Sequence, residues 1–163
     1  MRVIVNINVP ELAPAIDFYS AALGLQLSRL IAEDVAELSG ASSVIYLLRQ
    51  PAGSPPVRAL PLKRHYSRHW TPVHLDFVVD DLAAAAQRAL VAGAIQESAC
   101  VAWQGSKCIT FADPFGHGFC LIEFAGETYV QGNAEKATCR RSRAGGSPGA
   151  AGLLASRLRG NDD

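Results

Sequence analysis

The chain repeats one short pattern, and this repeat limits the possible folds more than any other feature of the sequence. The segment VIVNINVPEL, residues 3–12, returns as VHLDFVVDDL, residues 73–82. In each copy, residues of two kinds alternate as in a strand with one buried face, and the copy ends in an acidic residue followed by leucine. A helix-like stretch follows each copy, APAIDFYSAALGL in the first and AAAAQRALVAGA in the second. The repeat predicts a duplicated unit, with the working site between the two copies.

Each copy begins a unit of one strand, one helix and three further strands. In the first half we expect a helix over 12–23 that Gly24 ends, with strands over 3–9, 26–30, 35–38 and 42–50. In the second half we expect a strand from Val73, a helix over 82–92, and strands over 96–101, 107–112 and 118–124. The sequence therefore predicts an α+β fold of two tandem βαβββ modules.

The spacing of these elements divides the chain into four segments. The modules are expected over residues 1–49 and 71–126, joined by a proline-rich connection over 50–70. Basic and aromatic side chains in this connection suggest either a flap over an anionic ligand or a solvated linker. Residues 127–163 are rich in Gly, Ala and Arg and are expected to form a flexible tail.

The composition argues against several classes of protein. Fifteen Lys and Arg balance fifteen Asp and Glu, and the first 126 residues are slightly acidic. Nucleic-acid binding needs a concentrated basic face, which this balance does not provide. No apolar run is long enough to span a membrane, and the N-terminus alternates instead of forming a signal-peptide core. We expect a cytoplasmic protein that binds neither nucleic acid nor membranes.

Three segments carry a resemblance to a known superfamily: AIDFYSAALGL, HLDFVVDDLAAAA and FADPFGHGFCLIEF. In their order and spacing, residues 1–126 resemble the vicinal oxygen chelate superfamily, which includes glyoxalase I, bleomycin-resistance proteins and extradiol dioxygenases. The resemblance implies two curled mixed sheets around a cleft, with the helices outside. It also implies a homodimer, because members often build their clefts across subunits or pack their modules symmetrically.

Enzymes of this superfamily hold a divalent metal that polarises neighbouring oxygens of the substrate. The resemblance places the metal positions at Ile4 and Tyr46 in the first half and at His74 and Cys120 in the second. Isoleucine cannot bind a metal, and zinc held by His74 and Cys120 would need further ligands. We therefore expect no cofactor. Glu123 becomes a metal ligand together with His74 only if a bulge turns it, because strand alternation points it to the opposite face.

Strand parity predicts a polar lining for the cleft. Asn6 and Asn8 share one face of the first strand, as His74 and Asp76 do on the matched strand. The candidate ligand-binding residues are Asn6, Asn8, Tyr46, His74, Asp76, Trp103 and Cys120. His74 with Asp76 is the candidate catalytic acid–base pair, since imidazole titrates near neutral pH. The competing interpretation is structural: these side chains could satisfy one another or nearby backbone groups.

Two functions fit these expectations. In the first, a glyoxalase- or bleomycin-resistance-like protein binds a small, partly planar molecule in the cleft, without a complete metal site. In the alternative, a metal-dependent lyase or dioxygenase holds a divalent ion with His74 and Glu123. The first is favoured by the number of usable ligands.

Overall fold

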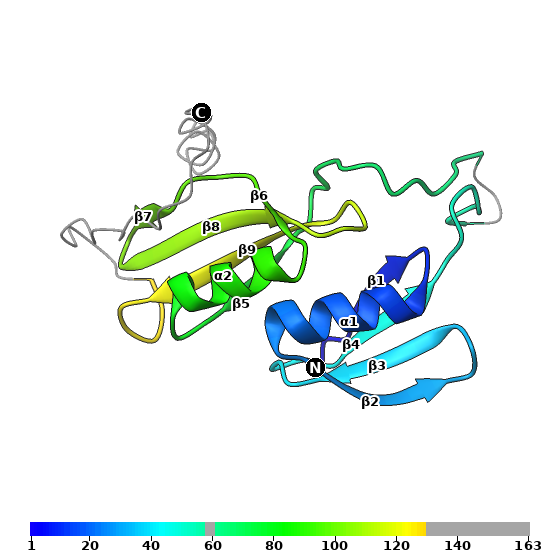
Figure 1. Ribbon diagram of the computed structural model, residues 1–163, viewed down its shortest axis with the longest axis horizontal. Helices are drawn as coiled ribbons and strands as arrows, with labels where there is room; N and C mark the ends of the chain where they lie inside the picture. Colours follow the sequence, from blue (N-terminus) through cyan, green and yellow to red (C-terminus); the bar gives the residue numbers. More distant parts are fainter. Residues whose placement is uncertain (58–60, 130–163) are drawn as a thin grey trace.

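The computed structural model describes residues 1–57 and 61–129, and its first half folds around one helix (Figure 1). Helix α1 spans Leu12–Leu23 as predicted, and Gly24 ends it in the left-handed conformation at φ 70°. The strands of this half are β1 (Val5–Val9), β2 (Gln26–Ile31), β3 (Val35–Ser39) and β4 (Ile45–Arg49). They form a sheet in the order β1-β4-β3-β2, in which only the β1–β4 pair is parallel.

The second half repeats this plan with one more strand. Helix α2 spans Leu82–Val91, and the Asp81 carboxylate caps it by accepting the N–H of Ala84 at 2.9 Å. The strands are β5 (Leu75–Val78), β6 (Ile95–Gln96), β7 (Val101–Trp103), β8 (Ser106–Ala112) and β9 (Gly118–Phe124). Their order is β5-β9-β8-β6, β7 also pairs with β8, and β5 is parallel to β9. Two helices and two mixed sheets confirm the α+β fold class.

Two further expectations concern the C-terminal tail and membrane-spanning helices. The tail predicted from residue 127 lies, beyond residue 129, outside the described residues. Within the residues that the structure does describe, neither helix is long and apolar enough to cross a membrane.

One predicted strand is wrong, because residues 96–101 do not form a continuous strand. The Glu97 N–H donates to the Thr110 carbonyl, as a sheet partner would. The Thr110 N–H, however, donates to the side-chain oxygen of Ser98 at 3.0 Å. A side chain has replaced a backbone partner, so the ladder is interrupted between β6 and β7. The alternating pattern of the sequence does not reveal that a side chain takes the place of a backbone partner.

The two helices pack against each other and join the halves in one core (Figure 1). Helix α1 covers the first sheet and α2 the second. Phe18 of α1 reaches the second half, where its ring meets those of Phe115 and Phe119 edge-on, with centroids 6.1 and 6.4 Å apart. The neighbouring Tyr19 hydroxyl donates to the buried Asp113 carboxylate at 2.6 Å. These contacts fix the position of one half against the other.

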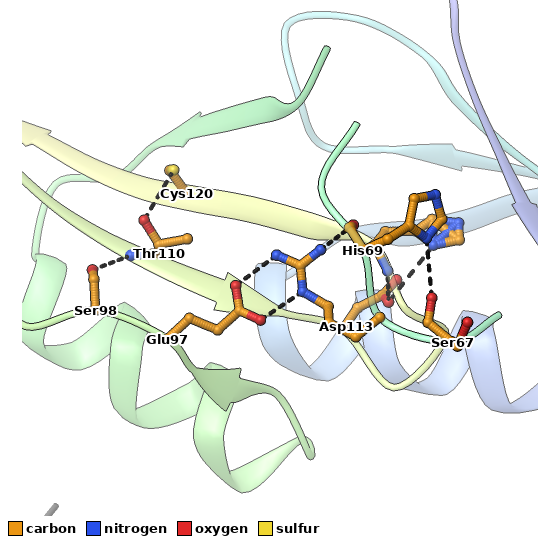
Figure 2. A network of polar contacts seen from close by, with 9 residues as sticks. Ser67, His69, Glu97, Ser98, Thr110, Asp113 and Cys120 are labelled. Carbon is orange, nitrogen blue, oxygen red and sulfur yellow. Dashed lines mark hydrogen bonds and ion pairs between the residues drawn. The ribbon is translucent and has the colours of Figure 1, made fainter. Parts of the chain in front are cut away.

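The connection over 50–70 makes specific contacts with the rest of the protein. Arg68 donates to both carboxylate oxygens of Glu97, at 2.6 and 2.5 Å (Figure 2). Arg64 donates to the carbonyl of Pro55 at 2.6 Å. The ion pair with Glu97 already occupies the Arg68 guanidinium group, which a flap over an anionic ligand would otherwise offer. The Arg64 contact lies within the connection itself, and the buried Nε atom of Arg64 has no hydrogen-bond partner among the described residues.

Candidate functional site

Each sheet turns one face to the helices, and its other face, called the open face below, carries no helix. In β9, Phe119 and Leu121 belong to the core that the helices share. Residues between them point the other way, so Cys120 lies on the open face. The strand register places Asp76 of β5 on one side of Cys120 and Thr110 of β8 on the other. The open face of the second sheet therefore carries polar and sulfur-containing side chains.

His74, Asp76 and Cys120 come together on this open face. The Nε2 atom of His74 lies 3.2 Å from Oδ1 of Asp76. One ligand atom from each of the three residues lies within 4.8 Å of the other two. The side chains of His74 and Asp76 are 42% and 41% exposed, whereas Cys120 is buried. The group therefore has the thiol at its base and the imidazole and carboxylate at its mouth.

A second thiol supports the base of this group. Thr110 Oγ1 lies 3.6 Å from Cys120 Sγ across the neighbouring strands (Figure 2). A hydrogen bond with Cys108 lowers the pKa of the Cys120 thiol. The same hydrogen bond, together with burial, raises the pKa of Cys108.

Aromatic rings border the open face. Trp103, at the end of β7, is about half exposed, and its ring lies 5.2 Å from that of Tyr129. The Tyr129 ring also lies 4.8 Å from that of Phe124 at the end of β9, and burial, followed by the charge of Asp76, raises the pKa of its hydroxyl. Trp103 was a sequence-based candidate, whereas Tyr129 was not. Tyr129 follows the last strand in a segment without periodicity, so no sequence signal marked it.

The first sheet carries a different polar group on its own strands. The register of β1 and β4 places Tyr46 beside Asn6, and Asn8 lies two residues further along β1. The Tyr46 hydroxyl donates to Glu37 Oε2 at 2.7 Å, and Arg29 donates to the same oxygen at 2.9 Å. The hydrogen bonds from Tyr46 and then Arg29 lower the pKa of Glu37. Only the register of β2, β3 and β4 brings Glu37 and Arg29 here, so alternation alone did not single them out.

The predicted ligand-binding residues therefore form two groups, one on each sheet. Asn6, Asn8 and Tyr46 belong to the first sheet, and His74, Asp76, Trp103 and Cys120 belong to the second or adjoin it. Within residues 1–57 and 61–129, no recorded hydrogen bond or ion pair joins the two groups.

Glu123 is not brought to His74. One of its carboxylate oxygens accepts the N–H of Leu82 at the start of α2, at 2.8 Å, and the other accepts the Lys107 ammonium at 2.7 Å. Strands β8 and β9 pair without a register shift from Gly118 to Phe124, so no bulge turns this side chain. Glu123 stays on the helix side of the sheet, and the metal pair of the alternative function is not assembled.

The position of Glu123 predicts a pH-dependent contribution to stability. The bonds from Lys107 and from the Leu82 N–H lower the pKa of Glu123. A carboxylate with a lowered folded-state pKa stabilises the fold above its unfolded pKa of about 4.3, and this stability is lost as the pH falls through the folded value. We expect Glu123→Gln to lower the free energy of unfolding by roughly 1–2 kcal/mol at neutral pH. Urea unfolding measures this difference.

The same measurement in acid provides the control. Below the folded-state pKa, Glu123 is protonated in the wild type, so the two proteins should approach each other in stability. Glu33→Gln, in an exposed turn, should have little effect at either pH. A Glu123→Gln protein as stable as the wild type at neutral pH would contradict the proposed role of the carboxylate.

An open groove with a volume of about 330 Å³ lies between the two halves, beside β5. Its lining comes from the end of α1, the turn over 40–42, strand β5 and helix α2. Asp76 belongs both to this lining and to the three-residue group. The volume is near the lower end of pockets that hold small molecules, about 300–1,000 Å³.

Comparisons with known proteins agree on the fold. The model of a glyoxalase-like domain matches residues 4–122. The solved lactoylglutathione lyase of Agrobacterium tumefaciens is 17% identical, with 76% of this chain and 92% of that chain covered and a TM-score of 0.53. A fosfomycin resistance protein of Listeria monocytogenes is 15% identical, with 76% and 92% covered and a TM-score of 0.58. A glyoxalase-related enzyme of Fulvimarina pelagi is 14% identical, with 76% and 87% covered and a TM-score of 0.60.

These comparisons settle the family but not the ligand. At such low identities the solved structures establish a common fold alone. The comparison with curated proteins gives no match. The family match, however, covers both halves of the chain, from the residue before β1 into β9. The protein therefore belongs to the glyoxalase-like family, within the vicinal oxygen chelate superfamily.

Proposed function

We propose that the protein binds a small, partly planar molecule on the open faces of its sheets, without the metal centre that the superfamily builds from both halves. The observation that carries this proposal is the contact between His74 and Asp76 on an exposed sheet face, beside the groove between the halves. A few converging polar groups in largely apolar surroundings are the usual make-up of a small-molecule site. Trp103 and Tyr129 supply rings on which a planar molecule could stack.

The residues at the superfamily's metal positions support this proposal, because they do not fit a shared metal. Ile4 offers no donor atom. Tyr46 belongs to the first sheet, and its hydroxyl donates a hydrogen bond to Glu37. His74 and Cys120 belong to the second half, so the first half offers no ligand at these positions. Recognition in the proposed site therefore depends on hydrogen bonds and stacking.

A second copy of the chain is the proposed partner. Within the described part of the chain, β1 pairs only with β4, and β5 only with β9, so each has a free edge. Exposed apolar side chains lie on or beside these two strands: Val3, Ile4, Val73 and Val78. Native proteins generally protect free strand edges, and symmetric dimers are the commonest homo-oligomers, so a homodimer that covers these edges is the proposed assembly.

Native mass spectrometry of the full chain, purified without denaturation, tests the proposal. We expect the wild type to appear as a dimer that carries a small molecule. Asp76→Ala should reduce the affinity for that molecule at least tenfold, about 1.4 kcal/mol, because Asp76 borders both the groove and the polar group. Glu33→Gln, in an exposed turn of the first half, is the matched control and should retain the molecule.

Two results would contradict the proposal. One is a wild-type protein that carries no small molecule and whose melting temperature no compound in a metabolite library raises. The other is an Asp76→Ala protein that keeps the molecule with unchanged affinity. Circular dichroism of each variant confirms that the fold is retained.

A further inference from the structure

We propose that the second half alone holds a zinc ion, bound by His74, Asp76 and Cys120 with one coordination position open. This site differs from the superfamily's metal centre because its ligands come from one half. One of them, Asp76, is also outside the metal positions that the resemblance implies. The inference goes beyond the proposed function, since a zinc ion can bind here whether or not a small molecule does.

The geometry of the three side chains carries this inference. With bonds of about 2.0–2.3 Å, the ligand atoms around a tetrahedral zinc lie roughly 3.3–3.8 Å apart. His74 Nε2 and Asp76 Oδ1 are already 3.2 Å apart, and all three ligand atoms lie within 4.8 Å of one another. The remaining adjustment is about 1 Å. His74 and Asp76 are about two-fifths exposed, so their side chains have room to rotate.

The strands determine why these three residues meet. His74 immediately precedes β5, and Asp76 follows two residues later on the same side of the extended chain. The parallel pairing of β5 with β9 then places Cys120 directly beside Asp76. The thiol is buried and anchored in the sheet, whereas the other two groups face solvent. An ion could therefore enter from the exposed side.

The donor atoms select the kind of metal. An imidazole nitrogen, a thiolate and a carboxylate oxygen form a ligand set that zinc accepts. Magnesium and calcium prefer oxygen ligands throughout. Three protein ligands leave a fourth position open, as in zinc sites that bind water or a substrate. The Lys107 ammonium is held by Glu123 on the other face of the sheet, so it does not compete for this position.

Cobalt and zinc titrations of the metal-free full chain test the inference. We expect one zinc ion per chain by elemental analysis. Cobalt should give the visible absorption of a four-coordinate ion with a sulfur-to-metal charge-transfer band, and zinc should displace it. His74→Ala, Asp76→Ala and Cys120→Ser should each weaken zinc binding at least tenfold. In Cys120→Ser the charge-transfer band should disappear.

His65→Ala is the matched control. His65 is an exposed histidine of the connection over 50–70, and it is outside the group whose ligand atoms are all within 4.8 Å. This variant should therefore keep the stoichiometry, the affinity for zinc and the charge-transfer band. His74→Ala changes a side chain at an exposed position, so it provides a test that does not depend on repacking around the buried thiol. Circular dichroism checks the fold of all variants.

The outcomes separate the two proposals. Failure of the wild type to bind zinc at one ion per chain, or a charge-transfer band that survives Cys120→Ser, would overturn the zinc site. A metal-free protein that keeps its small molecule yet takes up no zinc contradicts the zinc site alone. A protein that binds zinc at these residues but carries no small molecule supports the zinc site and contradicts only the proposed function.

Discussion

Asp113→Ala is expected to lower the free energy of unfolding by about 3–5 kcal/mol. The Asp113 side chain is completely buried, and it accepts the Tyr19 hydroxyl at 2.6 Å. It also accepts the backbone N–H groups of Phe115 at 2.9 Å and His117 at 2.7 Å. Alanine would leave three donors without this acceptor, and an unsatisfied buried donor costs about 1–3 kcal/mol. Urea unfolding followed by circular dichroism measures the change.

Tyr19→Phe is the graded control for this prediction. It removes one of the three donors and leaves the carboxylate bound to the two backbone N–H groups, so a smaller loss of roughly 1–2 kcal/mol is expected. The Tyr19 hydroxyl is the donor that crosses from α1 to the second half, whereas the two N–H groups lie in the turn after β8. Equal losses in the two variants would show that the turn contacts contribute little. An Asp113→Ala loss below about 1 kcal/mol would contradict the argument.

The elements that the sequence predicted well are those that a local pattern determines. Helix α1 has the predicted bounds because its apolar residues recur at helical spacing and Gly24 can adopt the left-handed conformation that ends it. The duplicated pattern was sufficient to indicate the family and the α+β fold class. The prediction of a continuous strand over 96–101 was wrong because the Ser98 side chain accepts the N–H of Thr110 in place of a backbone carbonyl. The alternating pattern of the sequence does not show this competition.

In the candidate site too, the sequence predicted what a local pattern determines and missed what depends on tertiary contacts. Parity placed His74 and Asp76 on one face but could not give their separation, which is 3.2 Å. The pairing of β5 with β9 then brings Cys120 beside Asp76, so that His74, just before β5, and one residue of each strand meet. Asp76 was not predicted as a metal ligand, because it lies outside the metal positions that the resemblance implies. Tyr129 was missed because its place depends on how the chain turns after β9.

Gly116→Ala is expected to destabilise the fold by about 2–4 kcal/mol, because at this residue the backbone of the connection over 50–70 packs directly against the second half. Gly116 has φ +88°, and a side-chain carbon added here would lie 2.6 Å from the carbonyl oxygen of Tyr66. That oxygen belongs to the backbone, so no side-chain rotation can relieve the contact. Left-handed backbone costs a residue other than glycine about 1–2 kcal/mol, and displacement of the connection adds to this.

Gly53→Ala separates these two causes. Gly53 also has a positive φ, of +81°, but an added side-chain carbon would meet nothing within 4 Å. Its expected loss is therefore the conformational cost alone, about 1–2 kcal/mol. The difference between the two variants in urea unfolding then measures the contact between Gly116 and the connection. If the two variants lose equal stability, the contact between Gly116 and the connection contributes little. The connection would then be held by other contacts, such as the ion pair between Arg68 and Glu97 and the stacking of Tyr66 on His117.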